Sequence, residues 1–117
     1  MMNAEMSKRM QDCMMACMDC HRSCMEMEMS CLDMGGCDSK MMKMMMDCAQ
    51  MCQVCADFMM RGSMMMMDMC MMCSRMCTEC AMMCESMTGN AKMMECAKTC
   101  RRCAEMCMQM AKAAKAA

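Results

Sequence analysis

The cysteines of this chain recur at intervals of three and four residues, and this spacing constrains the fold more than any other feature. In the stretch "DCMMACMDCHRSC" they stand at Cys13, Cys17, Cys20 and Cys24. Residues three and four apart share one face of an α-helix, whereas a strand places alternate residues on one face. The pattern therefore predicts helices that direct thiols, where leucines would be expected, at whatever they pack against.

The breaks between helices are marked by glycine, because the chain has no proline. Its four glycines are Gly35, Gly36, Gly62 and Gly89. We predict helices over about residues 3–34, 39–61, 63–87 and 90–115, with Ser39, Ser63 and Asn90 as N-caps. Short connections favour antiparallel neighbours. Residues 1–117 are therefore expected to form one domain of the all-α class, an up-down-up-down antiparallel four-helix bundle.

Read as heptads, the four segments carry sulfur at their seam positions, where side chains face the bundle axis. The seam cysteines are Cys13, Cys17, Cys20, Cys24 and Cys31, then Cys48, Cys52 and Cys55, then Cys70, Cys73, Cys77, Cys80 and Cys84, and finally Cys96, Cys100, Cys103 and Cys107. Only Cys37 lies off these seams, in the glycine-bearing loop. The axis is therefore predicted to be a column of thiols with methionine thioethers at its ends.

The composition is unlike that of natural proteins. Of 117 residues, 35 are methionine and 18 are cysteine, while leucine, valine and phenylalanine occur once each and isoleucine is absent. We interpret the chain as a methionine-enriched redesign or reduced-alphabet sequence, in which methionine replaces leucine, isoleucine or an aromatic residue. This interpretation leaves the cysteine pattern unchanged.

Charge and hydropathy argue against several classes of protein. A net charge of −1 with 1% aromatic residues provides neither a basic footprint nor a stacking surface for nucleic acid. Apolar runs such as residues 64–67 are too short to span a bilayer, and the first residues, "MMNAEMSKRMQDC", do not resemble a signal peptide. We expect a cytoplasmic protein, and in that reducing compartment many cysteines indicate metal or redox chemistry.

Three roles for the thiols that involve no metal are less well supported, namely core packing, disulfide bonding and redox catalysis. A column of small side chains would fill poorly the space between helices about 8 to 10 Å apart. Within a helix, thiols three or four residues apart have Cβ atoms roughly 5 to 6 Å apart, too far for a disulfide, although cross-helix pairs remain open on oxidation. The C-x-x-C motifs beginning at Cys52, Cys70, Cys77 and Cys100 lie inside helices, and His21 is the only histidine, so we expect no enzymatic activity.

Among soft metals, Cu(I) fits the pattern best. Tetrathiolate zinc sites would each carry about −2, which is costly in a dry bundle. Iron–sulfur clusters need loops that bend around them. Cu(I) prefers thiolate and thioether ligands and accepts as few as two of them. If each ion binds two thiolates and each thiolate bridges two ions, the core holds one ion per thiolate. The positive and negative charges then balance, and the core is neutral. A linear S–Cu–S unit of about 4.6 Å also matches the helical spacing.

The segments "DCHRSCMEMEMSC", "MGGC", "MCTEC" and "CAKTCRRCAEMC" resemble the bacterial copper storage proteins, over about residues 12–108. The resemblance implies a four-helix bundle whose cysteine-lined interior holds many Cu(I) ions, in the manner of the cytosolic branch of the family. It also implies a homo-oligomer, a tetramer, with copper ions as the partner. The methionine content departs from the family pattern.

Copper is expected to enter at the end that holds the glycine loops, where Cys31, Cys37 and Cys84 lie near the turns. By the same resemblance, Met27 and Met34 line this opening as weaker ligands that pass ions inward; the alternative is that both fill the core like the other methionines. His21, one residue off the seam, is expected to be a flanking polar residue. The alternative function is a designed or structural bundle rich in methionine and cysteine, with incidental binding of copper or zinc.

Overall fold

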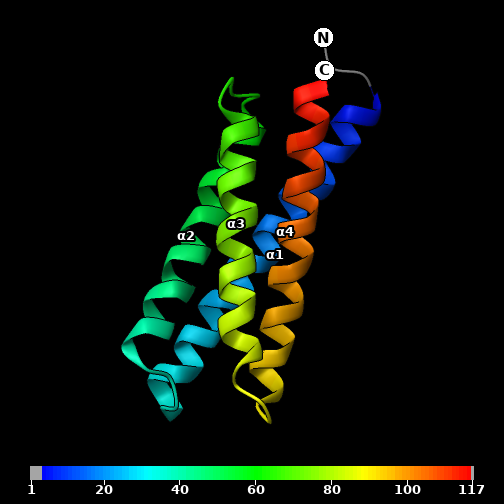
Figure 1. The fold of residues 1–117 in the computed structure, drawn as a ribbon. Helices are drawn as coiled ribbons and strands as arrows, with labels where there is room; N and C mark the ends of the chain where they lie inside the picture. The colour runs from blue at the N-terminus through cyan, green and yellow to red at the C-terminus, as the bar shows by residue number, and fades with distance from the viewer. Residues whose placement is uncertain (1–3, 117) are drawn as a thin grey trace.

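A computed structural model describes residues 4–116 of the chain, and within this range the chain forms four α-helices (Figure 1). The helices are α1 (Ala4–Met34), α2 (Ser39–Met60), α3 (Met66–Glu85) and α4 (Ala91–Ala116). The predicted all-α, antiparallel four-helix bundle is confirmed. The predicted start of the first helix at residue 3 lies outside the described residues.

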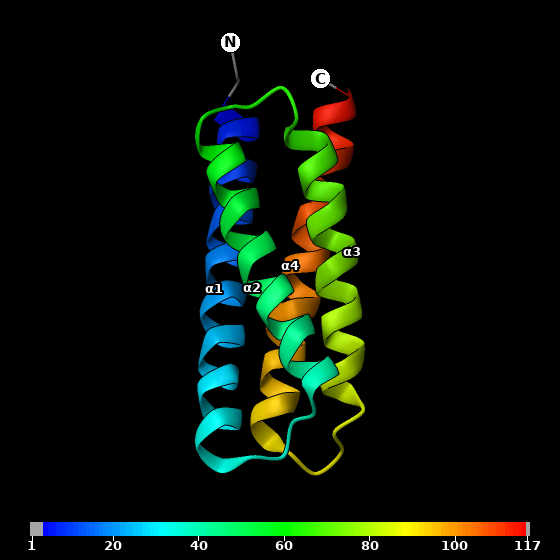
Figure 2. The same cartoon turned by 90° about the vertical axis from the view of Figure 1, so that its left-hand side faces the viewer.

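The helices stand at the corners of a square in chain order. α1 packs against α2 and α4, and α3 packs against the same two helices. The start of α1, the end of α4 and the α2–α3 connection lie at one end of the bundle, here called the terminal end (Figures 1 and 2). The α1–α2 and α3–α4 connections lie at the other, the loop end. With 31 residues at a rise of about 1.5 Å each, α1 spans almost the whole 48 Å length.

The start of α2 corrects one predicted N-cap. Asp38, rather than Ser39, precedes the helix, and its Oδ1 accepts the backbone N–H of Met41 at 2.8 Å. At α4 the predicted cap is confirmed, because Asn90 Oδ1 accepts the N–H of Met93 at 3.1 Å. The chain reaches Asp38 through Gly35 and Gly36, whose φ angles of 77° and 92° are unfavourable for other residues.

The third helix is shorter at both ends than predicted. It begins at Met66 because the chain first makes a turn, in which Ser63 N–H donates to Phe58 O at 3.0 Å and Met65 N–H donates to Ser63 Oγ at 3.0 Å. Ser63 therefore closes the turn and does not cap α3. At the other end the helix stops at Glu85, and a turn leads to Gly89.

The core is made of sulfur and small side chains. All the free cysteines are buried, and alanines such as Ala81 and Ala97 flank them. The α3–α4 packing is close enough for Ser74 Oγ to donate to the carbonyl oxygen of Ala104 at 2.7 Å. At the terminal end, Met10, Met59 and Met110 are buried above the thiols.

The outer faces carry much exposed methionine. Along α1 the side chains of Met18, Met25, Met29 and Leu32 are exposed, the last to 67%. Such a stripe exceeds the scattered apolar residues of an ordinary monomer surface. Within residues 4–116, no helix combines the length and hydropathy that crossing a membrane requires.

Candidate metal centre

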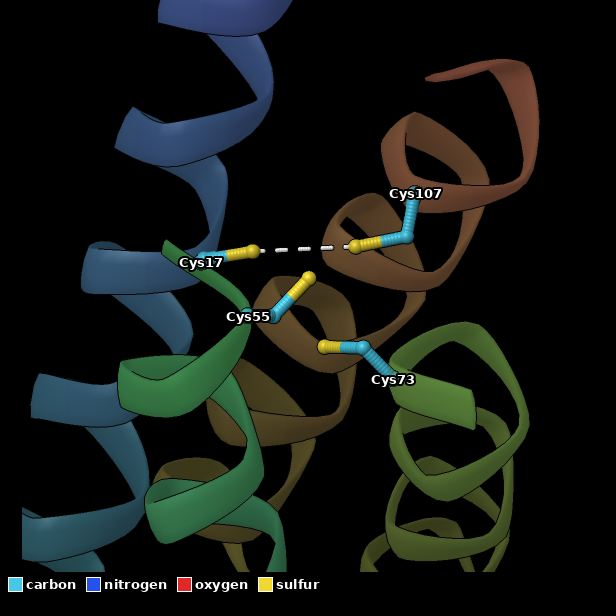
Figure 3. A group of neighbouring side chains, drawn as sticks. All are labelled: Cys17, Cys55, Cys73 and Cys107. Carbon is cyan, nitrogen blue, oxygen red and sulfur yellow. Dashed lines mark hydrogen bonds between the residues drawn. The ribbon is translucent and has the colours of Figure 1, made fainter. Parts of the chain in front are cut away.

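Four cysteines, one from each helix, meet on the bundle axis near the terminal end. They are Cys17 of α1, Cys55 of α2, Cys73 of α3 and Cys107 of α4 (Figure 3). Their sulfur atoms all lie within 4.8 Å of one another, and Cys17 Sγ is 3.6 Å from Cys107 Sγ. Heptad spacing brings them together, because each residue occupies a seam position of its helix.

A second group of four lies one step further toward the loop end. It consists of Cys20, Cys52, Cys77 and Cys103, again one from each helix and all within 4.8 Å. Cys52 Sγ is 3.6 Å from Cys77 Sγ and 3.9 Å from Cys103 Sγ. The two groups are joined, since Cys103 Sγ lies 3.8 Å from Cys17 Sγ.

The third group shares a member with the second. Cys20, Cys24, Cys48 and Cys100 also place their sulfur atoms within 4.8 Å of one another. Cys20 Sγ is 3.6 Å from Cys100 Sγ, and Cys24 Sγ is 3.9 Å from the same atom. Because Cys20 belongs to both groups, the clusters form one continuous array and not separate sites.

The array extends toward the terminal end through two more contacts. Cys13 Sγ is 3.7 Å from Cys107 Sγ, and Cys70 Sγ is 3.8 Å from Cys55 Sγ. Toward the loop end, Cys80, Cys84 and Cys96 are free and buried, but they fall outside the groups of four found in the described part of the chain. The seam assignment from the sequence thus placed these thiols in the core, as the structure does.

Two of the predicted ligands differ from the expectation of free thiols. Cys31 of α1 and Cys37 of the following loop form a disulfide, with a Cα–Cα distance of 5.7 Å. The spacing that disfavours disulfides holds only for pairs within one helix. Here Gly35 and Gly36 reverse the chain, so the pair joins a helix to a loop. In this oxidised form neither sulfur is available as a thiolate.

Of the residues predicted at the mouth, all but Cys84 line a cavity of about 250 Å³ at the loop end. Met27, Cys31, Met34 and Cys37 line it, together with both loop glycines, Asn90 and others. Met27 is buried, whereas Met34 is 79% exposed and therefore lies at the outer rim and not on the buried seam. Both thioethers are thus near the end of the thiol column.

His21 faces away from the array. Its Nδ1 lies 2.7 Å from the carbonyl oxygen of Ala49 on α2, and a carbonyl can only accept, so Nδ1 carries the hydrogen. This bond fixes the ring against the neighbouring helix. The arrangement agrees with a flanking polar residue.

The column has no buried cation to balance thiolates, since the ion pairs in the described residues are on the surface. Hydrogen bonds to Cys107 and Cys17, with burial, raise the pKa of the Cys103 thiol. Contacts with Cys80 and Cys96, again with burial, raise the pKa of Cys84. Each of these thiols needs a positive ion in place of its proton to become a thiolate in this setting.

Distances and charge together define what the array can bind. Three thiolates around one ion with bonds near 2.3 Å have sulfur atoms roughly 4 Å apart, and a tetrahedral zinc site has them only slightly closer. Sulfur–sulfur distances of 3.6 to 4.0 Å suit both arrangements, so distance does not distinguish the metals. Charge does, because monovalent ions at one per bridging thiolate leave the array neutral, whereas tetrathiolate zinc accumulates negative charge.

Comparison with known families gives a match over nearly the whole chain. The sequence profile of the copper storage proteins (Csp) matches residues 4–112. Among curated protein sequences no match is found.

Solved structures with the same fold include the Nmul_A1745 protein from Nitrosospira multiformis. It is 39% identical, with a TM-score of 0.84 over 92% of this chain and 98% of its own. The apo form of copper storage protein 3 from Bacillus subtilis is 30% identical, with a TM-score of 0.81 over 86% and 97% of the two chains. The Cu(I)-bound copper storage protein BsCsp3 is 28% identical, with a TM-score of 0.81 over 88% and 98%.

Proposed function

This chain belongs to the copper storage protein family, and we propose that it is a non-catalytic cytoplasmic store that holds many Cu(I) ions on its axial thiolates. The observation that carries the proposal is the continuity of the sulfur array, in which groups of four share Cys20 and adjacent groups touch through Cys17 and Cys103. A catalytic or structural site needs one such group. A column of them supports storage.

Loading exchanges protons for copper without electron transfer. Each Cu(I) that binds displaces the proton of one thiol, so the charge of the core is unchanged. A bridging thiolate then contacts two ions, and each ion two or three sulfur atoms. This exchange explains how the buried column can take up many ions without a change in its charge.

The proposed ligands are the eighteen cysteines of the reduced chain, with Met27 and Met34 at the loop end. An ion arriving at the cavity beside Met34 first meets a thioether, which binds Cu(I) more weakly than a thiolate and so releases it inward. Buried Met10, Met59 and Met110 cover the opposite end of the column. Uptake through the loop end follows from this asymmetry.

We also infer a homo-oligomer, a tetramer by family resemblance. The exposed apolar stripe on α1, which includes Met25 and Met29, supports burial against another copy. The 35 methionines support the interpretation of the chain as a methionine-enriched version of a copper storage protein. Thioethers replace branched side chains of similar volume at little cost in packing.

An anaerobic titration of the reduced protein with Cu(I), against a chromophoric chelator, tests storage. We expect the chain to withhold many ions from the chelator before free complex appears. Saturation at one or two ions would instead support the alternative, a structural bundle with incidental metal binding. Zinc in a parallel titration is the control, and we expect it to displace little Cu(I).

A further inference from the structure

We propose that Cys31 and Cys37 act as a two-electron dithiol at the loop end, which reduces Cu(II) that reaches the cavity there and supplies the thiol column with Cu(I). The pair forms a disulfide that joins the end of α1 to the following loop, while the other cysteines are free thiols in the same structure. Reduction of the metal goes beyond the proposed storage function. It rests on that function only for the destination of the ion.

The position of the pair makes its thiols the first that an ion entering at the loop end meets. Both cysteines line the cavity of about 250 Å³ at this end. Cys37 is only partly buried, whereas Cys31 and the 16 free cysteines are buried. At the terminal end Met59 and Met110 have no exposed surface, so the thiols beneath them are covered. Cys31 and Cys37 are therefore the electron donors that Cu(II) reaches most easily.

The two cysteines also have the placement that a two-electron oxidation needs. Their Cα atoms are 5.7 Å apart, which is typical of disulfide-bonded pairs. Thiols that touch within the column instead have sulfur atoms 3.6 to 4.0 Å apart, so joining them requires movement of side chains in a packed core. Oxidation by Cu(II) is therefore expected at Cys31 and Cys37 first.

The lining of the cavity favours Cu(I) over Cu(II). It includes the thioethers of Met27 and Met34, and soft sulfur ligands bind Cu(I) in preference to Cu(II). Among the described residues that line it there is no carboxylate or imidazole, which are ligands of harder ions such as Cu(II). Lys92 lines the same cavity, and a cation near a thiol stabilises the reactive thiolate. The surroundings thus favour both the electron donor and the reduced product.

Electrons and protons balance for two ions. Each Cu(II) gains one electron, and the two thiols lose two electrons and two protons as the bond between Cys31 Sγ and Cys37 Sγ forms. The products are two Cu(I) ions, one disulfide and two protons. Because neither sulfur remains a thiolate, both Cu(I) ions pass to the thioethers and the column. A small-molecule thiol then restores the pair by thiol–disulfide exchange, with Cys37 as the more accessible sulfur.

Electron paramagnetic resonance follows the reaction directly, since Cu(II) has an unpaired electron and Cu(I) has none. Reduced, anaerobic protein is mixed with two equivalents of Cu(II) sulfate, and we expect the signal to disappear with the loss of two thiols per chain. Two controls lack the dithiol, namely wild-type protein with the disulfide already formed and the variant C31A/C37A. We expect both to lose the signal about tenfold more slowly. The matched variant C13A/C70A, which removes two buried thiols toward the terminal end, is expected to react as fast as reduced wild type.

Peptide mapping of the wild-type protein identifies the oxidised thiols whatever the stability of the variants. After the reaction, alkylation and digestion with trypsin release residues 23–40, which contain Cys24, Cys31 and Cys37. We expect Cys24 to be alkylated and the other two to be joined. Faster oxidation of column cysteines than of this pair would overturn the proposal, as would equal rates in C31A/C37A and C13A/C70A. Storage fails separately, if the Cu(I) titration saturates at one or two ions.

Discussion

At the scale of single residues, a cysteine at a seam position packs less well than a leucine but provides a metal ligand. Cysteine fills less space than leucine, but its sulfur can accept a metal ion where a methyl group cannot. All four helices carry such a cysteine at one level of the bundle, at Cys17, Cys55, Cys73 and Cys107. Cys37 lies in a loop and not on a helix seam, and the loop brings its thiol to Cys31, with which it forms a disulfide.

The Cys31–Cys37 disulfide predicts a dependence of capacity on redox state. One pair of the 18 cysteines is oxidised and 16 remain as thiols, so unfolded oxidised protein should show 16 reactive thiols and reduced protein 18. Because each thiolate balances one ion, we expect reduction to raise Cu(I) capacity by about two ions.

The double variant C31A/C37A provides the control for this prediction. Its capacity is expected to be the same before and after reduction and to equal that of the oxidised wild-type protein. A wild-type capacity that reduction leaves unchanged would show that the two thiols bind no copper.

At the scale of the helix, the sequence predicts what lies inside a segment better than where the segment stops. The periodic seam defines the buried face of all four helices, because burial of that face decides the packing. Helix ends depend on single hydrogen bonds between backbone and side chain. Asp38 and Ser39 are both acceptable caps by composition, and only the turn after Gly36 selects Asp38.

The α3 boundary and the disulfide were missed for the same physical reason. Ser63 is used within the turn after α2, and Cys37 is directed at Cys31 by a loop whose glycines have positive φ. Neither loop has a period from which its path follows. Likewise, the seam pattern predicts which thiols face the axis but not that Cys20 contacts both Cys48 and Cys77.

Substitution at the start of α2 tests the corrected cap. D38A removes the acceptor of the Met41 N–H and is expected to lower the free energy of unfolding by about 1 kcal/mol in urea denaturation of the apo protein. S39A is the matched control, since Ser39 is already inside the helix and alanine is a good helix former. Equal losses in the two variants would mean that Asp38 does not act as the cap.

At the scale of the whole molecule, we expect bound Cu(I) ions to form part of the core of the bundle. In the apo column, contacts among the thiols raise the pKa of some above the ordinary value of 9.0, as at Cys24, where the contact with Cys100 leads and burial contributes, and lower the pKa of others, as at Cys17, where hydrogen bonds from Cys103 and Cys107 lead. A raised pKa in the folded state means that stability is fully present below pH 9. Stability is then lost as pH rises, because the unfolded chain releases protons that the folded chain retains.

We therefore expect the thermal midpoint of the reduced apo protein to fall as the pH rises above about 9, because the free energy of unfolding then drops by up to about 1.4 kcal/mol per pH unit for each thiol whose pKa is raised. The Cu(I)-loaded protein should have a higher midpoint and a much flatter profile over this range, because its thiols have already lost their protons. Circular dichroism during heating measures both. Parallel profiles for the two forms would mean that copper does not occupy the thiol column.

The central claim, that the ions lie on the bundle axis among the cysteine sulfurs, is tested most directly by anomalous diffraction from crystals of the Cu(I)-loaded protein at the copper absorption edge. We expect many copper peaks in a row along the axis, between sulfur atoms such as those of Cys17, Cys20 and Cys103. Copper peaks confined to the methionines on the outer faces, with the axial thiols free of metal, would contradict it.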